Sequence, residues 1–290
     1  MPEKLLLLRL EAPMQSWGVR ARWDVRDTGP EPTKSGIAGL LGCALKLRRG
    51  APELARLCAE LRFGVRADRP GEVATDYHTV TGYHRTAEGR FKHTAPIGNT
   101  TTLASAEMHA PFTVQSYRDY LHDASFLVAL AGAADLLSRL AEALQHPAWP
   151  IYLGRKSCVP TRPVFDDLTD RYEHLEDALR RAPWAAPADA RGRRAIARTF
   201  PPERVPGPLQ KWAGDGTWKP PSEPHRLTAW VEDEAGDYER QDVVQTDALR
   251  FYGFRRCRRL TVSIDGLEVM EDEPVSVAHR AEPGQPADAQ

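Results

Sequence analysis

The segment from Lys4 to Gly18, KLLLLRLEAPMQSWG, constrains the fold of this chain more than any other. It begins with a short apolar run that carries one interior charge, Arg9, and a break containing Pro13 follows directly. An apolar run of this length before such a break is typical of a buried central strand that leads into a functional loop. We therefore expect a sheet built around this strand, with the loop available to a ligand.

The loop after this strand has the side chains of a nucleotide site. Gln15 and Ser16 offer adaptable hydrogen-bonding groups, and Trp17 offers a broad stacking face. Gly18 lets a backbone approach a ligand closely. The alternative is that Trp17 covers a core and the residues before it form an ordinary turn, because a tryptophan after a strand is often a packing residue. The loop alone leaves both interpretations open, although it suits a nucleotide better than a metal ion.

Length and charge limit the kinds of partner. With 290 residues, the chain can hold one large domain or two modest ones and can bury a real core. Lys and Arg number 39 against 40 Asp and Glu, so the net charge of -1 gives no global attraction to nucleic acid or to an acidic membrane. Any RNA-binding surface must therefore be local.

The cysteines and the hydropathy pattern indicate a cellular compartment. Four cysteines are scattered without a CxxC pair or a matching His spacing, which supports neither a zinc site nor a secreted disulfide framework. No apolar stretch is long enough to span a bilayer, and Met1 is not followed by the pattern of a signal peptide. We expect a soluble, cytoplasmic protein with no metal and no other cofactor.

A basic cluster follows the first loop. Arg20, Arg22 and Arg26 lie close in sequence to Trp23, so cations stand beside an aromatic ring. Such a cluster can follow a phosphate backbone while the ring stacks on a base. Two nearby aspartates also fit a mixed-charge surface loop, and this segment leaves both interpretations open.

A helix is expected after Thr33, which has the side chain of an N-cap, because apolar residues recur at helical spacing beyond it. Lys34 and Ser35 then fall in the first turn, where backbone N–H groups and the helix dipole favour phosphate. The GxxxxGK[ST] spacing of a P-loop is absent, which disfavours nucleotide hydrolysis. Contact with an RNA phosphate remains open.

The segment YLGRKSCVPTRP offers another backbone-binding loop. Gly154 permits a tight turn, and Arg155, Lys156 and Ser157 place polar donors on it. Backbone N–H groups and cations that converge on a glycine turn can bind the RNA backbone. An exposed structural turn is the competing interpretation.

Residues 81–108 differ in composition from their surroundings, because they contain few large aliphatic side chains and many Gly, Thr, His and Arg. A protruding hairpin or lid fits this composition better than a core segment does. Arg85 and Lys92 would place positive charge on the projection. The histidines in and around it match no standard metal spacing.

The remaining patterns predict an α+β fold. Helices are expected after Thr33, over 52–62 and over 134–145, and strands over 63–67, 73–80, 112–121, 125–131, 227–231 and 258–264. The repeated order of strand, helix and strand favours helices packed on a mainly antiparallel sheet. Residues 183–224 are rich in Pro, Ala, Arg and Gly and fit an irregular boundary, and the acidic tail 266–290 is expected to be disordered.

Four ordered blocks, LLLRLEAPMQSWG, TKSGIAGLLG, QSYRDYLHDASFLVAL and YLGRKSCVPTRP, resemble one family. This is the CasD family of type I-E CRISPR systems, the RAMP-type subunit of the Cascade surveillance complex that holds the 5′ end of the guide RNA. The resemblance runs from about residue 4 to about residue 165, with a weaker echo at 245–262. Because the four blocks keep their order, the resemblance is specific, whereas any one block alone would be weak.

The resemblance implies a domain arrangement. Residues 1–165 would form a ferredoxin-like or RRM-like palm with a β-hairpin thumb at about 81–108. Residues 166–265 would form a smaller, β-containing C-terminal region. The thumb would coincide with the segment whose composition differs from that of a core.

The resemblance also implies a function and a set of partners. The protein would clamp the 5′ handle and cap the CasC backbone filament in antiviral defence, with CasA nearby and CasB and CasE in the same ribonucleoprotein complex. Target DNA would be read indirectly, by pairing with the guide. Carried over by block, the RNA-binding residues would be Gln15, Ser16, Trp17, Gly18, Lys34, Ser35, Gly154, Arg155, Lys156 and Ser157. Arg20, Arg85 and Lys92 join this set only by their location.

Two other functions compete with a non-catalytic role. Related type I-C subunits cut the guide precursor, and metal-free cleavage needs a base and an acid or cation, for which Tyr77, His78, His84 and Lys46 are available. Their spacing does not show that they converge, and type I-E systems are expected to assign cutting to CasE. The third possibility is a general RNA-binding scaffold protein outside CRISPR systems.

Overall fold

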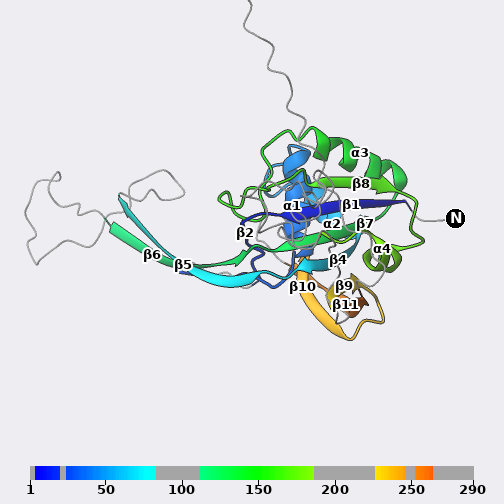
Figure 1. Cartoon of the computed structure of the whole chain (residues 1–290). Helices are drawn as coiled ribbons and strands as arrows, with labels where there is room; N and C mark the ends of the chain where they lie inside the picture. The colour runs from blue at the N-terminus through cyan, green and yellow to red at the C-terminus, as the bar shows by residue number, and fades with distance from the viewer. Residues whose placement is uncertain (1–3, 20–23, 83–111, 186–225, 246–251, 264–290) are drawn as a thin grey trace, which may run out of the picture. The chain divides into compact units, whose positions relative to one another are not determined.

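The computed structural model describes residues 4–19, 24–82, 112–185, 226–245 and 252–263 (Figure 1). These residues form a mixed α+β fold with a large antiparallel sheet, which confirms the predicted class. The strands are β1 (Leu5–Glu11), β2 (Met14–Gln15), β3 (Val25–Arg26), β4 (Arg62–Arg69), β5 (Glu72–Gly82), β6 (Phe112–His122), β7 (Ser125–Ala131), β8 (Phe165–Thr169), β9 (Arg226–Glu232), β10 (Tyr238–Val244) and β11 (Tyr252–Ser263). The helices are α1 (Lys34–Ala44), α2 (Pro52–Glu60), α3 (Ala134–Gln145) and α4 (Leu175–Arg181).

The large sheet has seven strands in the order β10-β11-β9-β4-β7-β1-β8, and every neighbouring pair is antiparallel. All seven residues of β1 are buried, as its apolar sequence predicts. The strand is interior but not central, because only β8 separates it from the edge of the sheet. Its side chains alternate between the two faces, so both faces of the sheet must be covered.

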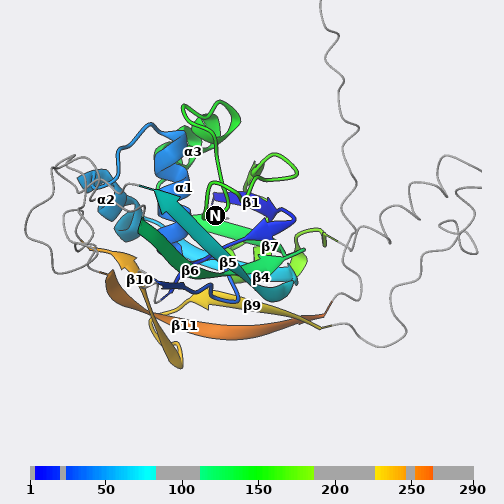
Figure 2. The ribbon, with the colours of Figure 1, turned by 90° about the vertical axis from the view of Figure 1, so that its left-hand side faces the viewer.

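Helices pack on both faces of the large sheet, and α1, α2 and α3 lie together on one of them (Figure 2). Leu6, Leu8 and Leu10 of β1 belong to a core cluster that also contains apolar residues of α1, α2 and α3. Helix α4 contacts β4 and β7 on the opposite face, where the backbone carbonyl of Leu179 accepts a hydrogen bond from Arg66. No described helix is long and apolar enough to cross a membrane.

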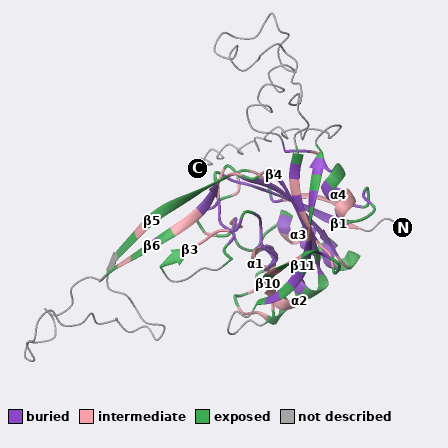
Figure 3. Ribbon diagram, turned by 90° about the horizontal axis from the view of Figure 1, so that it is seen from below, coloured by how far each residue is buried: buried purple, intermediate pink, exposed green. Residues whose placement is uncertain are grey.

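Strands β5 and β6 form a long antiparallel ribbon that extends away from the large sheet (Figure 1). Most of its side chains are exposed, in contrast to the buried sheet (Figure 3). Tyr77 and Tyr117 lie opposite each other on the ribbon with ring centroids 5.3 Å apart. The segment 83–111, and with it nearly all of the expected thumb, lies outside the described residues.

The C-terminal strands continue the large sheet. Strand β9 pairs with β4, and β11 pairs with β9, so the sheet crosses the boundary that the sequence places at residue 165. Residues 1–185 and 220–268 accordingly make one compact unit. Strands β2, β3, β8 and β10 and helix α4 were not predicted, because each is short and carries polar side chains. Most of 183–224 and the tail 266–290 lie outside the described residues.

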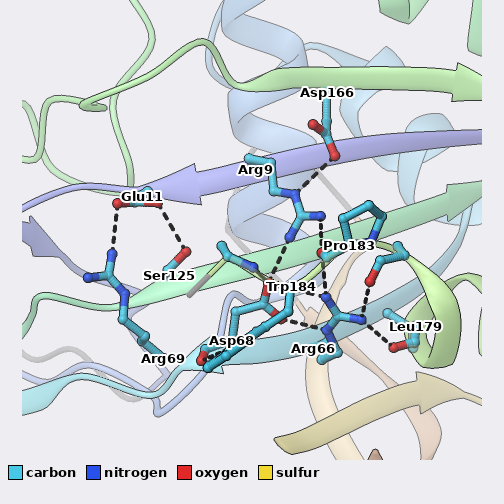
Figure 4. A network of polar contacts seen from close by, with 12 residues as sticks. Arg9, Glu11, Arg66, Asp68, Arg69, Ser125, Asp166, Leu179, Pro183 and Trp184 are labelled. Carbon is cyan, nitrogen blue, oxygen red and sulfur yellow. Dashed lines mark hydrogen bonds and ion pairs between the residues drawn. The ribbon is translucent and has the colours of Figure 1, made fainter. Parts of the chain in front are cut away.

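A buried charge network joins the sheet to α4 and the segment after it (Figure 4). Asp68 accepts hydrogen bonds from Arg9 at 2.7 Å and from Arg66 at 2.5 Å, and all three side chains are almost inaccessible to solvent. The two guanidiniums also donate to backbone carbonyls, including that of Pro183. Burial alone would raise the pKa of Asp68, but Arg66 and Arg9 outweigh it and hold this pKa below its ordinary value.

Candidate nucleic-acid interface

Segments that are distant in the sequence line one cavity of about 440 Å³. The lining comes from residues 16–18, 26–27, parts of 33–39 at the start of α1, parts of 49–54 around the start of α2, and 154–155. Val244 and Tyr252, at the adjoining ends of β10 and β11, complete it. Three of the loops that the sequence singles out therefore meet at one place.

The turn at Gly154 packs directly against the first loop. The backbone N–H of Ser16 donates to the carbonyl of Leu153 at 3.1 Å. Gly154 has a φ of +98°, and a Cβ at this position would overlap the carbonyl of Ser16. The tight glycine turn is thus confirmed, and both its backbone angle and this close approach require glycine.

Arg155 connects the turn to two other segments. Its guanidinium donates to the backbone carbonyls of Asp119 at 3.1 Å and Arg26 at 2.8 Å, and lies 4.5 Å from the centroid of the Tyr120 ring. These contacts fix the shape of the cavity wall and use donors that could otherwise reach an RNA phosphate. Lys156 and Ser157 are exposed on the same turn.

Gln15 and Trp17 do not have the exposure that the sequence analysis expects. Trp17 is 1% exposed, and its indole N–H donates to the side-chain oxygen of Gln15 at 3.1 Å. The amide nitrogen of Gln15 donates to the carbonyls of Leu10 and Ala124. The structure contradicts an open stacking face and a base-reading amide, and agrees with the alternative in which Trp17 belongs to the core.

Lys34, which the sequence analysis expects to contact phosphate, has partners within the protein. Its ammonium donates to both carboxylate oxygens of Glu232 at 2.8 Å, and its backbone N–H donates to Asp242 at 2.8 Å. Thr33 is confirmed as the N-cap, since its hydroxyl accepts from the N–H of Gly36. Carboxylates of β9 and β10 therefore accept from the donors of Lys34, while Ser35 lines the cavity.

Over residues 5–252 the sequence matches the family model described as CRISPR-associated protein (Cas_Cas5). The chain belongs to this family. It is 37% identical over 172 residues to the CRISPR system Cascade subunit CasD of Escherichia coli (strain K12), covering 55% of this chain and 69% of that protein. The resemblance to the CasD family is thus confirmed.

Solved structures of related CRISPR proteins have the same fold. A crystal structure of a Cas protein superposes with a TM-score of 0.60 and 29% sequence identity, covering 92% of this chain and 100% of that chain. A chain of a CRISPR RNA-guided surveillance complex gives a TM-score of 0.59 at 26% identity, covering 89% and 90%.

In this CRISPR-associated chain, the cavity residues that were not predicted as contacts include two arginines and a tyrosine, whose side chains suit RNA. Arg26 was noted only as part of a basic cluster, and Arg49 follows directly on another arginine before α2. Tyr252 lies more than 200 residues from the first loop, so no local pattern could place it at the cavity. The double arginine at 48–49 was the available signal for one of them.

Other predicted residues fall elsewhere. Arg20, Arg85 and Lys92 lie outside the described residues, as does His84 among the candidates for RNA cleavage. His78 contacts Asp76 at 2.7 Å on β5, and neither it nor Lys46 lines the cavity. Within the described ranges, no group of three His, Cys, Asp or Glu side chains is arranged to hold a metal ion.

Proposed function

We propose that this chain is the guide-RNA-binding subunit of a type I-E Cascade complex and that it holds the 5′ handle at the cavity. The observation that carries the proposal is the convergence of the loops at 16–18, 35–36 and 154–155 around one cavity. The similarity to a Cascade subunit and to a chain of an RNA-guided surveillance complex supports it.

The contacts divide the predicted residues into two roles. Ser16, Gly18 and Ser35 line the cavity with hydroxyl and backbone groups, and Lys156 and Ser157 are exposed beside it. These groups suit a backbone of phosphates and 2′-hydroxyls, which needs hydrogen-bond donors and cations. Gln15, Trp17 and Lys34 are buried and Arg155 is half-buried, and all four make hydrogen bonds within the protein; they would position the loops without contacting RNA.

The β5–β6 ribbon suggests how the subunit joins its complex. We infer that the ribbon is the stem of the thumb on a ferredoxin-like or RRM-like palm, since it extends from the sheet and exposes most of its side chains (Figure 3). In this arrangement the subunit caps the CasC filament with CasA nearby, and CasB and CasE belong to the same complex. Target DNA is read by the guide.

The subunit acts without catalysis in this proposal, and the alternative is a metal-independent endoribonuclease that processes the precursor. One experiment addresses both. The purified chain is incubated with labelled repeat precursor and, separately, with mature guide RNA plus CasC, and cleavage and complex formation are scored together. An intact precursor and a complex that requires the handle sequence are expected.

Charge reversal tests the site itself. Lys156→Glu is expected to weaken the complex at least tenfold, because it places a negative charge beside the RNA backbone. Arg139→Glu is the matched control, since Arg139 is exposed on α3 and does not line the cavity. Equal loss in the two variants, or cleavage of the precursor without CasE, would contradict the proposal.

A further inference from the structure

Part of the cavity wall is formed by residues outside the predicted RNA-binding loops. Gly39 of α1, Arg49 and Leu54 before and within α2, and Tyr252 of β11 contribute to this part of the wall. Tyr252 pairs with Val244 across the ends of β11 and β10, and it remains 40% exposed. A partly exposed aromatic ring at a cavity wall offers a face on which a planar group can stack.

The three glycines of α1 show where the open space lies. A Cβ at Gly36 would contact the Trp17 ring and the Thr33 hydroxyl, and a Cβ at Gly42 would overlap Leu54. A Cβ at Gly39 would meet nothing within 4 Å. The helix therefore borders unfilled volume at Gly39, and the cavity of about 440 Å³ lies within the range of small-molecule sites.

Arg26 and Arg49 have other surroundings than Arg155 at the turn. The guanidinium of Arg49 has no ion-pair or hydrogen-bond partner among the described residues, and the same holds for that of Arg26. The guanidinium of Arg155, in contrast, donates hydrogen bonds to backbone carbonyls. When the N–H groups of a cavity arginine do not donate to acceptors of the protein, they can bind a phosphate through two parallel hydrogen bonds.

We propose that this part of the cavity holds a single unstacked nucleotide of the guide RNA, with its base between Tyr252 and the surface at Gly39 and its phosphate at Arg49. The inference rests on the proposed function and adds a binding site for one nucleotide, which we call the nucleotide site. Single-stranded RNA is recognised through bases that leave the stack and lie on aromatic rings, and its phosphates pair with arginine. An aromatic face, an open volume and an unpaired guanidinium supply these elements at one place.

A substitution that fills the space gives the sharpest test. Gly39→Leu would project a side chain into the cavity, while leucine favours a helix more than glycine does, so the variant is expected to fold with an unchanged or higher Tm. Its affinity for guide RNA is expected to fall at least tenfold. Ala59→Leu is the matched control, because it adds similar bulk at an exposed position of α2 that does not line the cavity.

Substitutions of the ring test stacking separately. Tyr252→Ala is expected to weaken guide RNA binding by roughly 5- to 150-fold, the range for loss of one base–aromatic stack. Tyr252→Phe keeps the ring and is expected to stay within about twofold of the original protein. Guide RNAs with single 2-aminopurine replacements should show a fluorescence change on binding that Tyr252→Ala removes at one handle position only.

The outcomes separate this inference from the proposed function. Lys156→Glu could weaken guide RNA binding while Gly39→Leu and Tyr252→Ala bind like the original protein. The subunit would then bind guide RNA, but the proposed nucleotide site would be wrong. If the original protein shows no handle-dependent binding, the proposed function fails first. The nucleotide site would also be wrong if free mononucleotide inhibited guide RNA binding while these variants bound guide RNA like the original protein.

Discussion

Two groups of arginines in this CRISPR-associated protein have opposite surroundings. Arg9 and Arg66 lie in the sheet, are almost inaccessible to solvent and share Asp68 as their carboxylate partner (Figure 4). Arg26 and Arg49 line the cavity, and their guanidiniums have no described partner. The difference shows that an arginine stabilises the fold where its donors are occupied and buried, and is available to a ligand where they are not.

The largest expected effect is on the buried group. Asp68→Asn removes the negative charge that Arg9 and Arg66 share. The positive charges of the two buried guanidiniums then lose the carboxylate that balances them. Breaking a buried pair in this way lowers the free energy of unfolding by about 3–5 kcal/mol. Denaturant unfolding followed by circular dichroism measures it, and guide RNA affinity of the remaining folded protein should not change.

The control for Asp68→Asn is Asp167→Asn. Asp167 pairs with Arg171 near the surface, where both side chains are substantially exposed. Exposed pairs contribute about 0–1 kcal/mol. If both variants lost the same stability, burial would not be the property that separates the two groups of arginines.

The same network predicts how stability depends on pH. The pKa of Asp68 is lowered in the folded protein, whereas an unfolded aspartate has a pKa of about 3.9. The contribution of Asp68 to the free energy of unfolding is therefore complete above the unfolded pKa and is lost as the pH falls through the folded pKa. The difference in unfolding free energy between the original protein and Asp68→Asn should be constant from about pH 5 to pH 8 and shrink below about pH 4. A difference that grows in acid would contradict this assignment.

At the cavity, the expected effect is on binding and not on stability. Arg49→Gln should weaken guide RNA binding by about tenfold and lower the slope of log affinity against log salt by roughly 1, as for the loss of one phosphate contact. Its Tm should be unchanged. Arg155→Gln provides the contrast, because loss of its contacts to Asp119 and Arg26 should lower the Tm as well. Equal Tm losses in the two variants would remove the distinction between them.

The smallest effect is expected where an arginine is paired but exposed. Arg181 pairs with Asp177 one turn away on α4, and its side chain is 63% exposed. Arg181→Gln should cost about 0.3–0.5 kcal/mol and should leave RNA binding unchanged. Unfolding in low and high salt checks this, since the small difference should vanish as salt screens the pair.

Local patterns in the sequence determined much of the fold. The apolar run of β7, at Ser125–Ala131, and the helical stripe of α3, at Ala134–Gln145, match the structure at both ends. The Thr33 N-cap and the tight turn at Gly154 are also as expected. Each of these features depends on residues within a few positions of one another, through periodicity, capping or backbone angle.

Tertiary structure decided which functional candidates remain accessible. Lys34 is paired with Glu232, a residue 198 positions away, and Trp17 is enclosed by a core to which several elements contribute. Tyr252 reaches the cavity only because β11 joins the large sheet through β9. The sequence by itself determined the family and elements such as β7 and α3, since those depend on ordered blocks and local patterns. Burial and ion pairing depend on which distant segments meet, so only the folded chain separates the residues that hold the loops from those that face the cavity.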